Sequence, residues 1–163
     1  LLHVVPFTTL QQLIYQYVRE DYGITIMRRM MYRISERLAK KIQAEIIING
    51  ESIGQVASQT LESLAVTDDA VDMPVFRPLI GFDKIEIIRL AEQIGTYATS
   101  SLPYEDCCTV FTPRHPVTRP KLPRVLEAEG MIPDAQAMLN EAVETAECLL
   151  ISPEVGVLSG ENP

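Results

Sequence analysis

The run from position 48 to position 60 constrains the fold of this chain most. It follows the apolar stretch Ala44–Ile48 and precedes Leu61, so we expect a strand that ends in a glycine turn and opens directly into a helix that starts with Glu51 and Ser52. In an open α/β sheet, nucleotides bind in the crevice at the carboxyl ends of the strands. This run is therefore the first candidate for a functional site, and it reads INGESIGQVASQT.

Strand and helix patterns alternate around this run, which is typical of a parallel sheet with crossover helices. The sequence therefore predicts the α/β fold class. The expected elements are a parallel strand at Leu1–Val5, a helix from Thr8 to about Arg19, a helix from about Thr25 to Gln43, strands at Glu45–Ile48 and Pro74–Ile80, and helices over 84–94 and 134–147.

Local signals indicate where several of these elements begin and end. Thr8 with Gln11, and Asp83 with Glu86, have the spacing of a capping box at a helix start. Gly95 is expected to end the helix that Asp83 begins.

Prolines and low periodicity mark the remainder of the chain. The prolines between positions 103 and 123 predict a stiff, extended loop rather than the interior of a sheet. The tail from Ser152 has no clear period, and we expect it to be disordered.

The composition is that of a single compact domain. The chain has 163 residues, is 47% apolar and carries a net charge of −8, so as a whole it is not a basic nucleic-acid binder. It shows no signal peptide and no apolar run long enough to cross a bilayer. Three cysteines do not form a secreted disulfide framework, so we expect a cytoplasmic protein. Because the chain opens on Leu1 inside an expected strand, we expect it to be a piece of a longer protein.

Polar residues in the opening run can line a ligand crevice. Gly50 would let a ligand approach the backbone closely, although a plain turn glycine is the more common interpretation. Gln55, Ser58 and Gln59 would share one face of the expected helix.

Two arginines are the candidate phosphate ligands. Arg28 and Arg29 would lie in the first turn of their helix, where exposed amides favour anions. The planar fork of a guanidinium also suits phosphate. A solvated basic face is the alternative interpretation.

The adjacent Cys107 and Cys108 lie at the start of the proline-rich loop, a position that keeps thiols accessible for sulfur chemistry. A small apolar filler is the alternative for at least one of them. His115 belongs to a basic stretch of the same loop, which would be either a phosphate-backbone contact or a solvated loop. The sequence shows no Cys/His metal pattern, so we assign no metal ligands.

The run from Asn49 to Thr60 resembles the (T)GES-x-GQVASQT signature of the tRNA 4-thiouridine sulfurtransferase family, also called the ThiI family of thiamine biosynthesis. The resemblance continues in order and with ordinary spacing from Leu1 to about Lys121. Other segments that carry it are RRMM at 28–31, RPLI at 77–80, DK at 83–84, IGT at 94–96 and PYEDCCTVF at 103–111.

The resemblance implies a PP-loop ATP pyrophosphatase domain of the adenine-nucleotide α-hydrolase type. This is a Rossmann-like parallel sheet with helices on both faces, here incomplete at the N-terminus. Residues 1–125 would be the C-terminal part of that domain, and 126–163 a C-terminal helix and tail. Family members use ATP and Mg²⁺ to adenylate the carbonyl oxygen of a tRNA uridine. A persulfide sulfur from a cysteine desulfurase then displaces AMP to give 4-thiouridine, and some members hand sulfur to the carrier protein ThiS.

The resemblance also assigns site residues by position. Arg28, Gly50 and Gln59 match the residues that contact ATP in the family. Cys107 or Cys108 matches the family cysteine of sulfur transfer: the neighbouring residues favour Cys108, whereas simple counting favours Cys107.

The chain departs from the family pattern in two ways. Asn49 replaces the usual Thr. The SGG-[IL]-DS pyrophosphate-binding loop is absent and would lie upstream of Leu1, as would the ferredoxin-like and THUMP domains through which the parent protein would bind tRNA.

These departures lead us to expect that the fragment alone is inactive. They also favour self-association as a homodimer, because a missing strand would expose a sheet edge. A non-catalytic association module and another PP-loop adenylating enzyme are the alternatives.

Overall fold

The structure, a computed structural model, describes residues 1–56, 59–104, 113, 115–152 and 156–159, the last four by their backbone alone. Helices and short strands alternate along it, and the fold is α/β. The strands are β1 (Leu2–Val4), β2 (Ile47–Ile48), β3 (Val75–Phe76), β4 (Glu147–Ser152) and β5 (Gly156–Ser159). The helices are α1 (Thr8–Tyr17), the 3₁₀ turn η1 (Glu20–Tyr22), α2 (Gly23–Lys41), α3 (Leu61–Asp68), α4 (Lys84–Gln93), α5 (Tyr97–Ser100), α6 (Leu122–Glu129) and α7 (Ala135–Glu144).

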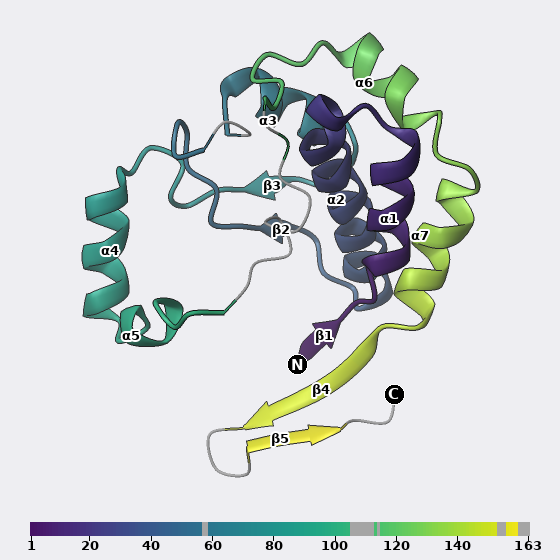
Figure 1. Cartoon of the computed structure of the whole chain (residues 1–163). Helices are drawn as coiled ribbons and strands as arrows, with labels where there is room; N and C mark the ends of the chain where they lie inside the picture. Colours follow the sequence, from purple (N-terminus) through teal and green to yellow (C-terminus); the bar gives the residue numbers. More distant parts are fainter. Residues whose placement is uncertain (57–58, 105–112, 114, 153–155, 160–163) are drawn as a thin grey trace.

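Helix α2 forms the centre of the core and contacts α1, α3, α6 and α7 (Figure 1). Its apolar side chains recur at helical spacing, which is why one face of the helix can be buried along its length. Ile26 and Met30 of α2 are fully buried, as are Val125 of α6 and Leu139 of α7. Because four helices share this face, burial of apolar surface holds the helical layer together.

The strands form two small sheets. β2 and β3 are parallel, with Ile47 opposite Val75 and Ile48 opposite Phe76. In Figure 1 this pair lies between α2 and α4, and α4 stands apart from the helical core. The predicted strands over 45–48 and 74–80 are therefore present, but the described sheet in which they pair has only two short strands.

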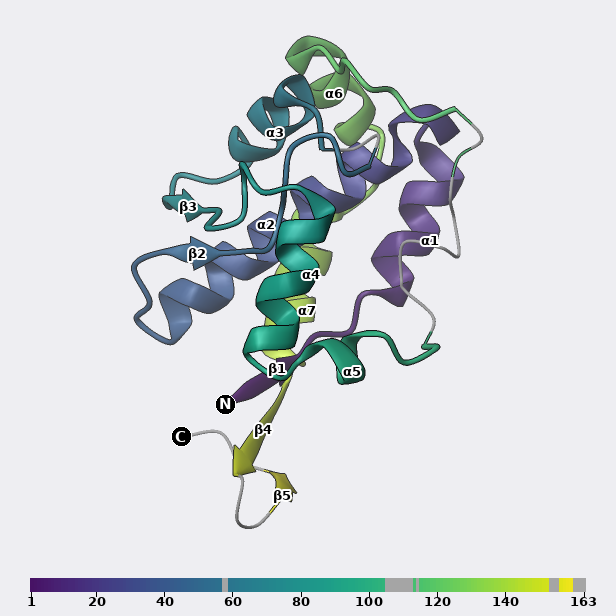
Figure 2. The same ribbon diagram turned by 90° about the vertical axis from the view of Figure 1, so that its left-hand side faces the viewer.

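The N-terminal strand does not pair as the sequence predicted. β1 lies antiparallel to β4, with His3 opposite Cys148, and β4 in turn pairs with β5. The prediction of a parallel strand at Leu1–Val5 was wrong, as was that of a disordered tail from Ser152 at the described residues. The reason is that both segments pair with strands, and such pairing leaves no periodic signal in the local sequence. Figures 1 and 2 both show the β4–β5 hairpin projecting from the helical body.

The helix expected to open at Glu51 is also absent from the described residues. Residues 49–56 and 59–60 form turns and irregular backbone, and α3 begins only at Leu61. Gly54 has a positive φ of 78° and its amide donates to the Gln59 carbonyl at 2.9 Å, which closes a turn where a helix would continue. The hydroxyl of Thr60 then accepts from the Ser63 amide at 3.1 Å and caps α3.

The two predicted capping boxes had different outcomes. The box at Asp83 and Glu86 is confirmed, because each side chain bonds the backbone amide of the other residue. Gly95 follows α4 with a φ of 75°, as expected for a residue that ends a helix. The box at Thr8 was wrong: α1 has Phe7 at its cap position with no side-chain cap bond.

The longest described helix is α2, with 19 residues. Within the described ranges, none of the helices combines the length and apolar character needed to cross a membrane. Position 125, where the predicted domain division falls, lies inside α6. That division remains a prediction.

Candidate functional site

The candidate site lies where β2 and β3 end. The two strands are parallel, so the loops that follow them, over 49–60 and 77–82, leave the sheet at the same edge. The Asn49 amide donates to the Phe76 carbonyl of β3 at 3.1 Å. Two bonds then link the loops themselves: the Ile53 amide donates to the Ile80 carbonyl at 3.1 Å, and the Ser52 hydroxyl to the Phe82 carbonyl at 2.7 Å. Hydrogen bonds thus hold the two loops together at this edge of the sheet, and we call them the braced loops.

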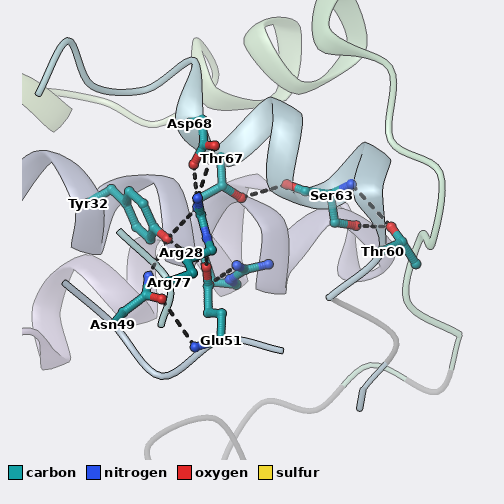
Figure 3. A network of polar contacts seen from close by, with 9 residues as sticks. All are labelled: Arg28, Tyr32, Asn49, Glu51, Thr60, Ser63, Thr67, Asp68 and Arg77. Atoms are coloured by element: carbon teal, nitrogen blue, oxygen red, sulfur yellow. Dashed lines mark hydrogen bonds and ion pairs between the residues drawn. The ribbon is translucent and has the colours of Figure 1, made fainter. Parts of the chain in front are cut away.

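Glu51 lies at the centre of a polar network at this edge (Figure 3). One carboxylate oxygen pairs with Nη2 of Arg28, which reaches down from α2. The other oxygen accepts from Nε of Arg77 at 2.7 Å and from the Tyr32 hydroxyl at 2.7 Å. The Arg28, Glu51 and Arg77 side chains are only 10 to 12% exposed, so these charges interact largely out of water.

The network continues from Arg77 to α3 and back to the loop after β2. Both terminal nitrogens of Arg77 donate to the Asp68 carboxylate: Nη1 donates to Oδ2 at 3.2 Å, and Nη2 donates to Oδ1. Its Nη2 also donates to the Tyr32 hydroxyl at 3.0 Å. Asn49 donates to that hydroxyl at 2.6 Å, and its own side-chain oxygen accepts from the Glu51 amide at 3.1 Å. Side chains from α2, α3 and both loops therefore form one connected unit.

The pairing shifts the ionisation of the network's members. Burial raises the pKa of Glu51, but the Arg77 hydrogen bond and the Arg28 charge outweigh it, so the net pKa is below the usual range. Burial and the bond to Glu51 raise the pKa of Tyr32 to about 12. Burial alone would lower the pKa of Arg77, but its bonds to Asp68 and Glu51 raise it overall. At neutral pH Glu51 and Arg77 are therefore both charged.

The two candidate arginines have different surroundings. Arg28 faces the braced loops through Glu51, but it lies in the second turn of α2, which starts at Gly23. The prediction that a helix N-terminus would assist it was wrong, because the helix begins earlier than its pattern indicates. Arg29 is fully buried against α6 and α3, where its Nε donates to Glu129 at 2.7 Å. That contact makes Arg29 a structural ion pair in the core rather than a ligand.

Gly50 and Gln59 lie in the loop after β2. Apart from its two chain neighbours, no heavy atom of the described residues lies within 4 Å of the position that a Cβ would take on Gly50, so the described surroundings leave the backbone open to approach there. Oε1 of Gln59 is buried and finds no hydrogen-bond partner among the described residues. A buried acceptor without a donor carries a cost that an incoming donor would remove. The expected shared helical face of Gln55 and Gln59 is not formed, because neither residue is helical.

Several other predicted residues lie either outside the described part of the chain or at other ion pairs. Cys107, Cys108 and Ser58 lie outside the described residues. Of the basic residues in the proline-rich loop, Arg119 lies 3.6 Å from Glu62 and Arg124 lies 2.9 Å from Glu127. Where the structure is described, no group of three or more His, Cys, Asp or Glu side chains is placed to hold a metal ion.

Sequence reasoning missed the residues at the centre of the network. Glu51 was expected only as the first residue of a helix, and Tyr32 and Asp68 were not singled out. A usable signal was present: Arg77 follows β3 directly, Glu51 lies three residues after the end of β2, and the two carry opposite charges. The sequence gave no such signal for Tyr32, because a tyrosine within an apolar helix pattern cannot be told apart from a residue of the hydrophobic core.

Comparisons with known proteins agree on the relatives of this chain. The family described as "Thiamine biosynthesis protein (ThiI)" matches residues 1–133. A "Probable tRNA sulfurtransferase" of Geobacillus kaustophilus is 50% identical over 155 residues, covering 95% of this chain and 38% of the relative. Another of that name, from Thermoanaerobacter sp., is 58% identical over 128 residues, covering 78% of this chain and 34% of the relative.

A solved structure matches as well. The "Crystal structure of a 4-thiouridine synthetase - RNA complex with bound ATP" aligns with a TM-score of 0.82 at 40% identity, covering 89% of this chain and 38% of that one. The chain thus spans less than two-fifths of the length of these relatives. The family match covers most of the chain and includes the braced loops, so the chain belongs to the ThiI family of thiamine biosynthesis proteins.

Proposed function

We propose that this chain is part of an ATP-dependent tRNA sulfurtransferase that converts a tRNA uridine to 4-thiouridine. The observation that supports it most is the site at the end of β2 and β3, which carries Arg28, Gly50 and Gln59 in a chain 40% identical to a 4-thiouridine synthetase seen with ATP and RNA. In this proposal residues 1–125 form the C-terminal part of a PP-loop adenylation domain, and 126–163 form a C-terminal helix and tail.

The complete domain would be a Rossmann-like parallel sheet with helices on both faces. The parallel pairing of β2 and β3, with α2 and α4 on opposite sides in Figure 1, supports this arrangement. The site would then lie at the carboxyl edge of the sheet, where such folds bind nucleotides.

Each site residue has a chemical role in this proposal. The Arg28 guanidinium supplies N–H donors to an ATP phosphate oxygen, and its positive charge favours the negative charge that develops during transfer. Gly50 lets the nucleotide lie close to the backbone. The unpartnered oxygen of Gln59 accepts a hydrogen bond from an amino group such as that of adenine.

The reaction has two steps. The uridine carbonyl oxygen attacks the α-phosphorus of ATP and pyrophosphate leaves, which turns a poor leaving group into AMP. The terminal sulfur of a persulfide then attacks the carbonyl carbon of the adenylated uridine, and AMP leaves with the oxygen. A second thiol attacks the inner sulfur of the persulfide, which breaks the S–S bond, leaves the transferred sulfur on the uridine and forms a disulfide that a thiol reductant reduces between turnovers. Cys107 or Cys108 would be the residue on the sulfur side, with a cysteine desulfurase as the source of the persulfide.

Mg²⁺ would accompany ATP and offset its phosphate charge. Glu51 and Asp68 do not fit as its ligands, because both are paired with arginine. We therefore assign no protein ligand to the ion.

The wider setting follows from the same proposal. In it, the parent protein binds tRNA through further domains and forms a homodimer. It is located in the cytoplasm and also supplies sulfur to ThiS. The exposed apolar residues of β1, Leu2 and Val4, support association through that sheet.

The proposal is tested with the complete protein that contains this chain. Purified protein is incubated with tRNA, ATP, Mg²⁺, cysteine and a cysteine desulfurase, and 4-thiouridine is measured in digested tRNA. We expect it to form, and we expect negligible turnover from residues 1–163 alone. No ATP binding by the complete protein would contradict the proposal.

The sulfur side has its own prediction. Replacing Cys107 and Cys108 together by Ser in the complete protein should abolish 4-thiouridine but leave tRNA-dependent pyrophosphate release intact, because the first step needs no thiol. Cys148→Ser is the matched control: Cys148 is buried in β4, and its variant should keep both steps. Unchanged 4-thiouridine in the double variant would exclude both cysteines.

A further inference from the structure

The Glu51 carboxylate lies between two guanidinium groups that have different surroundings. Arg77 also forms an ion pair with Asp68, so it has a second carboxylate partner. Arg28 belongs to the proposed nucleotide site and pairs with Glu51. Any movement of Glu51 therefore reaches the nucleotide site through Arg28.

Arg28 needs such a carboxylate for a physical reason. Its side chain is 11% exposed, and a guanidinium removed from water carries a large desolvation cost unless an anion compensates it. An arginine side chain also has many rotamers, and ordering it costs conformational entropy. A carboxylate fixed at Nη2 selects one of these rotamers and sets the plane of the fork before a ligand arrives.

Glu51 itself is held on three sides. Arg77 and Tyr32 bond its second oxygen, and Asn49 bonds its backbone amide. The Tyr32 hydroxyl uses its one proton on Glu51 and accepts from Asn49 and Arg77, so its bonding capacity is filled. The carboxylate therefore has a defined position that it can impose on Arg28.

We propose that Glu51 is a positioning residue for the nucleotide site: it holds the Arg28 guanidinium in the orientation that receives a phosphate oxygen of ATP, and Tyr32, Arg77 and Asn49 hold Glu51. The inference rests on the proposed function in one respect, namely that the ligand of Arg28 is ATP. A guanidinium has five N–H donors in a planar fork, so a carboxylate and a phosphate oxygen can bond different N–H groups of one guanidinium. The opposite role, an anion that competes with phosphate for Arg28, predicts tighter ATP binding when Glu51 is neutralised.

The test measures ATP dissociation constants of the complete protein by calorimetry. The variants are Glu51→Gln, which keeps the shape of the side chain but removes its charge, Arg28→Ala, and the two combined. We expect Glu51→Gln to weaken ATP binding about tenfold, the scale of one charge-assisted hydrogen bond. The double variant should bind no more weakly than Arg28→Ala, because Glu51 acts through Arg28.

A matched control pairs with two other arginines of α2. Glu129 is also a nearly buried carboxylate that bridges two arginines, Arg29 and Arg33, but it lies at the α2–α6 contact. Glu129→Gln removes a comparable ion-pair centre without touching Arg28. It should lower thermal stability and leave the dissociation constant for ATP unchanged below the unfolding transition.

A second readout follows Arg28 without ATP. Phenylglyoxal modifies accessible arginines, and mass spectrometry of the digest gives the rate at Arg28. We expect this rate to rise severalfold in Glu51→Gln and to stay at the wild-type value in Glu129→Gln.

The outcomes separate the two proposals. Weaker binding in Arg28→Ala with unchanged or tighter binding in Glu51→Gln overturns the positioning role and leaves the nucleotide site in place. An unchanged modification rate at Arg28 in Glu51→Gln also overturns the positioning role. Absence of ATP binding in the wild type, or no effect of Arg28→Ala, overturns the nucleotide site and the positioning role together.

Discussion

At the scale of single residues, two largely buried carboxylates in the described structure each join two arginines. Glu51 pairs with Arg28 and Arg77 at the sheet edge, and Glu129 pairs with Arg29 and Arg33 in the core. A buried pair is not a large net source of stability compared with apolar packing, but removing one partner leaves an uncompensated charge. These carboxylates are therefore positions where a neutral substitution has a large effect.

Glu51 predicts how stability depends on pH. Its folded pKa is lowered, so its contribution is fully present above the unfolded value of about 4.3 and is lost as the pH falls through the folded pKa. At pH 7 Glu51→Gln should lower the free energy of unfolding by about 3 kcal/mol. The difference from wild type should shrink below about pH 4, where the wild-type carboxyl also becomes neutral.

Urea denaturation of both proteins over pH 3 to about 7 measures this difference. A constant gap between wild type and variant across that range would show that the Glu51 charge does not stabilise the fold.

At the scale of elements, the helices differ in what stabilises them. α2 is held by its buried apolar face. By contrast α4, all of whose residues the structure describes, has no fully buried side chain. An isolated helix of this length is marginal in water, so α4 depends on its local signals, the capping box at Asp83 and the glycine that ends it.

Asp83→Ala should therefore destabilise α4 by about 1 kcal/mol while leaving the helical core unaffected. Hydrogen exchange of the α4 amides should accelerate, whereas exchange in α2 should not change. Asp83→Asn keeps a capping oxygen and is the matched control, with α4 exchange close to wild type. Equal acceleration in α2 would mean that α4 is coupled to the core more tightly than its burial indicates.

At the scale of the whole molecule, the core joins segments that are far apart in the chain. Leu139 of α7 is fully buried in the cluster around Ile26 and Met30 of α2. α7 also leads directly into β4, which pairs with β1 at the other end of the chain. The packing of α7 on α2 therefore brings the two ends of the described structure together.

Leu139→Ala should lower the free energy of unfolding by about 2–5 kcal/mol, because it removes apolar contacts and leaves a cavity. Leu61→Ala is the control: Leu61 is 66% exposed on α3, and its variant should stay within about 0.5 kcal/mol of wild type. Chemical denaturation of the complete protein compares the two. Equal effects would show that α7 is not part of the cooperative core.

Local chemistry made parts of the structure predictable. The helical spacing of α2, the capping box of α4 and the glycine after it act within a few residues, and all three are present as expected. The motif around Gly50 also indicated the family. The family match over residues 1–133, which includes this motif, confirms it. The role of Arg28 as an ATP ligand stays a prediction; the helix terminus expected beside it is not there, and the structure shows it paired with Glu51.

The sequence by itself determined the α/β class, the helices with strong periodicity or caps, and the family, since each depends on short-range patterns. Only the tertiary structure decided that β1 pairs antiparallel with β4, that the run after β2 is a braced loop, and that Glu51 centres the network. These features depend on partners far away in the chain, and burial sets their energies. A carboxylate such as Glu51 becomes a positioning group only when folding brings two arginines and a tyrosine to it out of water.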